Sequence, residues 1–254
     1  MSLPKLEVIL SPAEFTTLSQ RDLSQAVCVV FDILRATTSM ITALANGAEA
    51  IIPVAEIAEA VALKQKNPNL LLAGERDGLR IRAELTGSID FDLGNSPREF
   101  TAEKVSGRTI VMTTTNGTRA LRACSEARIV LVSSFLNLRA TTNWILERKP
   151  QHLILVCSGT GEEPALEDML AAGALCEKVW SNYAGGRVSD AAEMARRIYP
   201  LMQSDLLEAM KGAKNGRRLL ANPDLRDDVR LCVQRETIPF AVTMMPSGVV
   251  RKLD

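Results

Sequence analysis

Short apolar runs alternate with stretches of helical periodicity along most of the chain. Six mostly apolar runs of four or five residues cover positions 28–31, 50–54, 70–73, 109–112, 128–132 and 153–156. Runs of this length, bounded by turn-forming residues, are typical of strands buried on both faces of a parallel sheet. The helical stretches between them place helices on both faces. The pattern predicts a three-layer α/β/α fold with mostly parallel strands, as one domain over residues 1–254.

The same order of features occurs twice. A strand, a hydroxyl-rich turn with an arginine, and then a helix, strand, helix and strand occupy about 25–105 and recur at about 106–185. Identity between the copies is low, and ordinary β-α-β repetition gives a similar order. We interpret these segments as two pseudo-repeats within the domain. Helical patterns follow at 164–181 and at 191–209, and we expect Pro200 to interrupt the second.

The stretch from Val29 to Leu44 joins an apolar strand to a helix through Asp32, Arg35 and three hydroxyl residues. Thr and Ser side chains accept hydrogen bonds from the free N–H groups of a first helical turn. A carboxylate, an arginine and a helix start in one place can hold an anion, or a phosphate if a metal ion binds the carboxylate. The alternative is a buried strand that leads into a capped helix, with Asp32 in structural hydrogen bonds.

Other polar clusters lie after the remaining predicted strands and in a long loop. They are Glu75–Arg76, Asn95, Thr113–Asn116, Ser158 and Glu167–Asp168. Ligands of open parallel sheets bind beyond the carboxyl ends of the strands, so we expect these clusters to line one crevice. Carboxylates bind Mg²⁺, and arginine binds phosphate through a two-pronged fork. Each cluster also has a plain explanation as a turn, a helix cap or a surface ion pair.

Composition narrows the classes of function. The 30 basic and 30 acidic residues give no reason to expect nucleic acid or an anionic membrane as a partner. We find no membrane-length apolar run and no signal peptide, and the five cysteines form no C-x-x-C pair, so we expect a cytoplasmic protein. The single histidine, His152, argues against a His-rich zinc site and a Ser-His-Asp triad. The chain also lacks a P-loop.

Five blocks carry a family resemblance. They are Val29–Thr38, Leu72–Arg76, Phe91–Pro97, Thr113–Ala120 and Leu166–Asp168. In this order, and over nearly the whole chain, they closely resemble the 2-phosphosulfolactate phosphatase, or ComB, family. The resemblance implies a Mg²⁺-dependent phosphoric monoester hydrolase with an α/β/α fold. Such an enzyme converts 2-phosphosulfolactate, or a related phosphorylated 2-hydroxy acid, to sulfolactate and phosphate during coenzyme M biosynthesis. A homodimer is compatible with this family resemblance.

We expect a metal-bound water to attack the phosphorus atom. The expected catalytic carboxylates are Asp32, Glu75, Glu167 and Asp168, and the expected Mg²⁺ ligands are Asp32, Glu75 and Asp168. The expected substrate-binding residues are Arg35, Arg76, Asn95, Thr114, Thr115, Asn116 and Ser158. Two alternatives stay open: a non-catalytic module that binds an anion or phosphometabolite without a metal, and a covalent phosphatase that uses Cys157.

Overall fold

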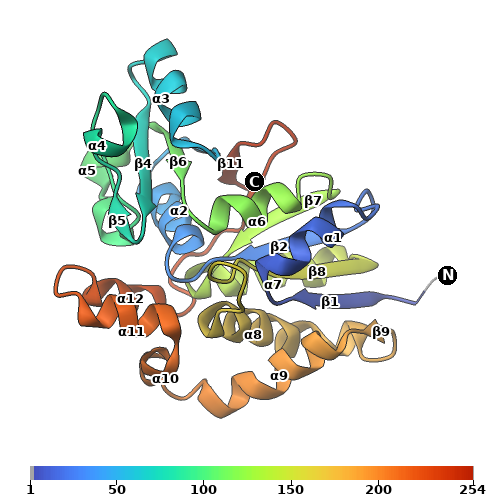
Figure 1. The fold of residues 1–254 in the computed structure, drawn as a ribbon. Coiled ribbons are helices and arrows are strands. Elements are labelled where there is room, and N and C mark those ends of the chain that lie inside the picture. The colour runs from blue at the N-terminus through green and yellow to red at the C-terminus, as the bar shows by residue number, and fades with distance from the viewer. Residues whose placement is uncertain (1–2, 254) are drawn as a thin grey trace.

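The computed structural model describes residues 3–253 and contains one eleven-stranded sheet with helices on both faces (Figure 1). Most neighbouring strands are parallel, which confirms the predicted three-layer α/β/α fold. The strands are β1 (Lys5–Ile9), β2 (Val27–Phe31), β3 (Ala50–Pro53), β4 (Leu71–Arg76), β5 (Leu79–Arg80), β6 (Thr109–Thr113), β7 (Ile129–Ser133), β8 (His152–Cys157), β9 (Arg187–Val188), β10 (Val242–Met244) and β11 (Val250–Lys252).

The sheet consists of two parallel sets of strands that run in opposite directions. One set has the order β4-β6-β3, with the short β5 antiparallel at its edge, and the other has the order β7-β2-β8-β1-β9. Between them lies the antiparallel hairpin β10–β11, whose strands pair antiparallel with β7 and β3. Three antiparallel pairings in a row reverse the strand direction. The carboxyl ends of the two sets therefore do not form one continuous edge, contrary to the expectation of a single crevice along a parallel sheet.

The strands of the two predicted repeats are interleaved. Strand β6 lies between β4 and β3, and β2 lies between β7 and β8, so each central strand comes from the other segment of the chain. Helix α2 (Ala36–Ala45) therefore leads from β2 to the opposite set, and α6 (Gly117–Ala123) leads back from β6. The two helices begin close together, because a Cβ atom on Gly117 would lie 2.7 Å from the Cβ atom of Ala36. The internal repeat itself stays a prediction.

Three apolar clusters hold the layers together. One lies under α1 (Phe15–Ser19), α2 and α6, a second under α7 (Leu138–Arg148), α8 (Leu166–Tyr183) and α9 (Asp190–Met202), and a third under α3 (Ile57–Lys66). Cys28 and Val30 of β2 belong to the first cluster, whereas Val29 and Phe31 belong to the second. This alternation explains why β2 is apolar throughout. The remaining helices are α4 (Ala83–Thr86), α5 (Ala102–Val105), α10 (Leu206–Gly212), α11 (Lys214–Ala221) and α12 (Arg226–Cys232), and short 3-10 turns cover Pro12–Glu14, Pro97–Glu99 and Phe135–Asn137.

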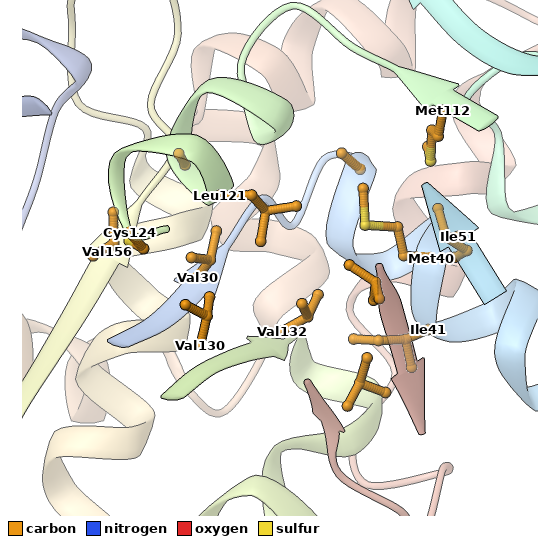
Figure 2. Packing of buried hydrophobic residues seen from close by; sticks show 14 of the residues in the cluster. Val30, Met40, Ile41, Ile51, Met112, Leu121, Cys124, Val130, Val132 and Val156 are labelled. Atoms are coloured by element: carbon orange, nitrogen blue, oxygen red, sulfur yellow. The ribbon is translucent and has the colours of Figure 1, made fainter. Parts of the chain in front are cut away.

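The first cluster spans the junction between the strand sets (Figure 2). Met40 of α2 and Leu121 of α6 contribute to it from the helices, and Val30 and Ile51 contribute from the opposed sets; all four side chains are fully buried. Full burial of a side chain of this size stabilises the fold by about 1.5–3 kcal/mol. The packing therefore fixes the starts of α2 and α6 relative to both strand sets.

Two helix expectations need correction. The helix expected from residue 164 begins at Leu166, because Ala165 is extended. The expected interruption at Pro200 is wrong: Pro200 lies inside α9, and the chain leaves the helix only after Met202. Pro200 is exposed, so water can satisfy the carbonyl group that a proline leaves without its N–H partner. Within residues 3–253, no helix is long and apolar enough to cross a membrane.

Candidate active site

A polar cavity of about 210 Å³ lies at the junction of the two strand sets. Its walls come from the turn after β2, the β4–β5 turn, the loop before residue 97, the turn before α6, the loop after β8, and helix α11. The predicted site residues that line it are Asp32, Arg35, Glu75, Asn95, Thr115 and Asn116. Segments from the two strand sets and from the C-terminal helices thus meet in one place.

Asp32 stands directly after β2 and is nearly buried. Its Oδ1 atom accepts a hydrogen bond at 3.0 Å from the N–H group of Ala36, the first residue of α2, although Arg35 is the N-cap residue of that helix. Its Oδ2 atom faces the start of α6, where a Cβ atom on Gly117 would lie only 2.8 Å away. Burial, assisted by the charges of Glu75 and Glu167, raises the pKa of Asp32 to about 7. The carboxyl group therefore combines a structural contact with an oxygen that faces the cavity.

Glu75 near the end of β4 is held by three hydrogen bonds. Its Oε1 atom accepts from Thr115 N at 2.8 Å and from Thr115 Oγ1 at 2.9 Å, and its Oε2 atom accepts from Gly78 N at 2.7 Å. These bonds tie β4, the β4–β5 turn and the turn before α6 together. They fix the carboxylate in one orientation beside the cavity.

Arg35 is the buried cation of the cavity, with 3% of its surface exposed. Its Nη1 atom donates to Asp228 Oδ2 at 2.7 Å, and its Nη2 atom donates to Gly78 O at 2.7 Å. Asp228 lies on α12, is fully buried, and accepts two further hydrogen bonds at Oδ1, from Ser96 Oγ at 2.6 Å and Arg98 Nε at 2.8 Å. The guanidinium group is therefore oriented before any ligand arrives, and two of its five N–H donors are in use.

Glu167 and Asp168 lie in a second layer behind Asp32 and do not line the cavity. Both oxygens of Asp168 accept backbone hydrogen bonds, from Ile33 N at 2.8 Å and Gly159 N at 3.0 Å. Glu167 Oε1 accepts from Asn215 Nδ2 at 2.7 Å, and its Oε2 atom has no partner among the described residues. Burial raises the pKa of both carboxyl groups, and the charge of Asp32 adds to the effect on Asp168.

The sequence did not point to several functional candidates. Asn215 and Arg218 of α11 line the cavity, as do Thr160 and Gly78. Asn215 is almost buried. It donates hydrogen bonds to Thr160 Oγ1 at 2.6 Å and to Glu167 Oε1 at 2.7 Å. The only signal was a polar run from residue 214 to 218, too basic for an ordinary core-facing helix. The contact with the cavity depends on the docking of α11, which no local pattern encodes.

Comparison with known proteins assigns the chain to a family. The profile of the family described as 2-phosphosulpholactate phosphatase matches residues 14–245. The chain belongs to this family. A protein of Caldicellulosiruptor saccharolyticus is 36% identical over 220 residues, or 85% of this chain and 88% of its own length. A protein of Caldanaerobacter subterraneus is 35% identical over 239 residues, or 93% and 95%. Both are named probable 2-phosphosulfolactate phosphatase.

Three expected substrate-binding residues of this 2-phosphosulpholactate phosphatase family member do not line the cavity. Arg76 donates to Thr113 Oγ1 at 3.0 Å and to backbone carbonyl groups, because successive residues of a strand face opposite sides of the sheet. Thr114 is buried, and its hydroxyl group accepts from Thr118 N at 3.4 Å in the first turn of α6. Ser158 is fully buried, and its hydroxyl group has no partner among the described residues.

The cavity of this family member offers oxygen ligands that suit Mg²⁺, and two of them are carboxylates. Mg²⁺ usually binds one or two carboxylates and completes its shell with water and substrate phosphate oxygens. Asp32 and Glu75 supply two, and the buried Oδ1 atom of Asn95 has no partner among the described residues. Residues 3–253 contain no group of three acidic, histidine or cysteine side chains that could hold an ion by themselves. Asp168 is buried and does not line the cavity, so it is a poor third ligand.

Proposed function

We propose that the protein is a Mg²⁺-dependent phosphatase. Its substrate in this proposal is 2-phosphosulfolactate, or a related phosphorylated 2-hydroxy acid, and its products are sulfolactate and phosphate. The observation that carries the proposal is the pairing of two fixed carboxylates, Asp32 and Glu75, with the buried Arg35 around one small cavity. Membership of the 2-phosphosulpholactate phosphatase family supports the same chemistry. A role in coenzyme M biosynthesis, a cytoplasmic location and a homodimer stay predictions.

Asp32 and Glu75 would hold the cation, and Arg35 would bind phosphate oxygens on the adjacent wall. When bound, Mg²⁺ neutralises phosphate charge and makes water a better nucleophile. The free N–H groups of Arg35 donate to phosphate oxygens, and the charge of the guanidinium group stabilises the negative charge of the transition state. Thr115 and Asn116 stand at the start of α6, where they limit how the ester can lie.

Glu167 and Asp168 have supporting roles in this proposal. Asp168 holds the backbone after β2 and the backbone after β8 in register, through Ile33 N and Gly159 N. Glu167 anchors Asn215 and so positions α11 against the cavity. Their charges also repel that of Asp32, and a divalent cation held by Asp32 and Glu75 would offset this repulsion.

The proposal is tested by measuring phosphate release from phosphosulfolactate and from p-nitrophenyl phosphate, with Mg²⁺ and after chelation. We expect activity only with the metal. Asp32→Asn and Glu75→Gln should each lower kcat at least about a hundredfold, because each removes a carboxylate that serves the cation. Glu103→Gln, an exposed change on α5, is the matched control and should retain the wild-type rate.

Two outcomes would contradict the proposal. Undiminished activity after chelation would rule out the metal-dependent mechanism. An absence of turnover on every phosphate ester, with retained binding of phosphosulfolactate by calorimetry, would favour the non-catalytic anion-binding module.

A further inference from the structure

Two guanidinium groups meet at Gly78 in the β4–β5 turn. A Cβ atom on Gly78 would lie 3.7 Å from Nη2 of Arg218 and 3.8 Å from Nη2 of Arg35. Gly78 also has a backbone φ of +80°, a conformation that residues with side chains rarely adopt. The turn thus leaves an open space between two cations at one wall of the cavity.

The two arginines differ in how their charges are balanced. Arg35 is buried and paired with Asp228. Arg218 is exposed on α11 and forms no ion pair or side-chain hydrogen bond with any other residue in the described part of the chain. Like charges at such close range repel each other unless an anion lies between or beside them. Arg218 is therefore a cation at the cavity with no direct ion pair in the described part of the chain, and Glu167 is an acid whose carboxyl group its charge affects.

The support of α11 gives Arg218 a defined position. Asn215, one turn earlier on the same helix, is almost buried and donates to Thr160 Oγ1 and Glu167 Oε1. Residues three apart on a helix lie on the same face, so these bonds hold the Arg218 face toward the cavity. The carboxylates Asp32 and Glu75 belong to the strand-end wall, so the cavity has an acidic wall and a basic rim.

We propose that Arg218 forms a second anion subsite, which selects phosphate esters that carry another acidic group on or next to the ester carbon. This inference rests on the proposed phosphatase function. With the phosphate at Arg35 and the cation site, a molecule that fits about 210 Å³ has only a few atoms between its acidic groups. A carboxylate or sulfonate on such a molecule reaches the rim where Arg218 stands. The arginine fork binds the oxygens of either group through two parallel hydrogen bonds.

The experiment compares two substrates that differ only in the second acidic group. In 2-phospholactate a carboxylate is attached to the ester carbon, and in isopropyl phosphate a methyl group replaces it. The measured quantity is the ratio of kcat/KM for the first substrate to kcat/KM for the second. Arg218→Ala should lower this ratio about 10- to 100-fold, the loss expected for a charge-assisted hydrogen bond. Arg218→Lys keeps the charge without the fork and should lower it less.

The matched control is Arg217→Ala. Arg217 is the exposed neighbour on α11, lies outside the cavity lining, and donates to the carbonyl group of Gly212. The Arg217→Ala substitution should leave the ratio of the two kcat/KM values unchanged. An unchanged ratio in Arg218→Ala, or an equal fall in both alanine variants, would overturn the subsite while leaving the phosphatase intact. Failure of the wild-type protein to hydrolyse these two esters and phosphosulfolactate would instead overturn the proposed function.

Discussion

Asp228→Asn tests how firmly the C-terminal helices hold the cavity together. The three groups that contact this carboxylate are all donors: Arg35 Nη1 at 2.7 Å, Ser96 Oγ at 2.6 Å and Arg98 Nε at 2.8 Å. An asparagine side chain has the same shape but only one accepting oxygen, and its NH₂ group is itself a donor. At least one of the three donors must therefore face another donor, and Arg35 loses its counterion.

The size of the effect follows from burial. Asp228 is fully buried and Arg35 is 3% exposed, so neither water nor salt can replace the lost charge. Removal of one partner of a buried ion pair lowers the free energy of unfolding by about 3–5 kcal/mol. Because Arg35 keeps its bond to Gly78 O and asparagine keeps one acceptor, we expect the lower end, about 3 kcal/mol. For a chain of this length, that corresponds to a fall in Tm of about 6–12 °C.

The assay is guanidinium unfolding at pH 7 followed by circular dichroism, with Tm from calorimetry as a second measurement. Asp227→Asn is the matched control, since the Asp227 side chain is 59% exposed and its one ion pair within residues 3–253 is with Arg98, at 3.8 Å. An exposed pair of this kind is worth less than about 1 kcal/mol. If Asp228→Asn and Asp227→Asn lowered the free energy of unfolding equally, the buried network would not stabilise the fold as we argue.

Three further predictions concern other parts of the molecule. Gly117→Ala places a Cβ atom 2.8 Å from Asp32 Oδ2, so kcat/KM should fall at least about tenfold while unfolding by urea shows a loss of only about 1–3 kcal/mol. Burial would raise the pKa of Glu7, but hydrogen bonds from His152 and basic neighbours hold it well below its ordinary 4.5. The stability from Glu7 is thus fully present above pH 4.5 and is lost as the pH falls further, so unfolding curves of wild type and Glu7→Gln should converge in acid. Burial also raises the pKa of the Cys157 thiol, so Cys157→Ser should keep the full rate, and a large loss would revive a covalent mechanism.

The sequence predicts the sheet well because its strands are strongly apolar. Strands such as β2 and β8 are buried on both faces and need continuous apolar runs, which are visible without any tertiary knowledge. Short strands such as β5, β9 and β11 were not predicted, because they have only two or three residues and partly exposed side chains. They form because neighbouring strands offer open hydrogen-bonding edges, a tertiary effect that leaves no periodic signal.

The site is predictable mainly where it lies at strand ends, and Asn95 of the long loop is the exception. Asp32 directly follows an apolar run, Glu75 follows another after Gly74, and both line the cavity. The neighbouring Arg76 was an equal candidate in the sequence, but only one of two successive strand residues can face a given side. Asp228 and Arg218 come from C-terminal helices whose docking depends on contacts with residues more than a hundred positions away. No local pattern carries that information.

The opposed direction of the strand sets explains why the cavity needs every part of the chain. In a single parallel sheet, neighbouring strand ends alone would form a crevice. Here the central strands β2 and β6 belong to opposed sets, so their carboxyl ends approach only where α2 and α6 cross the junction. That crossing brings Asp32 against Gly117 but leaves one side open. Helices α11 and α12 border that side, with Arg218 at the rim and Asp228 as the counterion of Arg35. The strand ends thus supply the acidic wall, and the basic side depends on how the C-terminal helices dock.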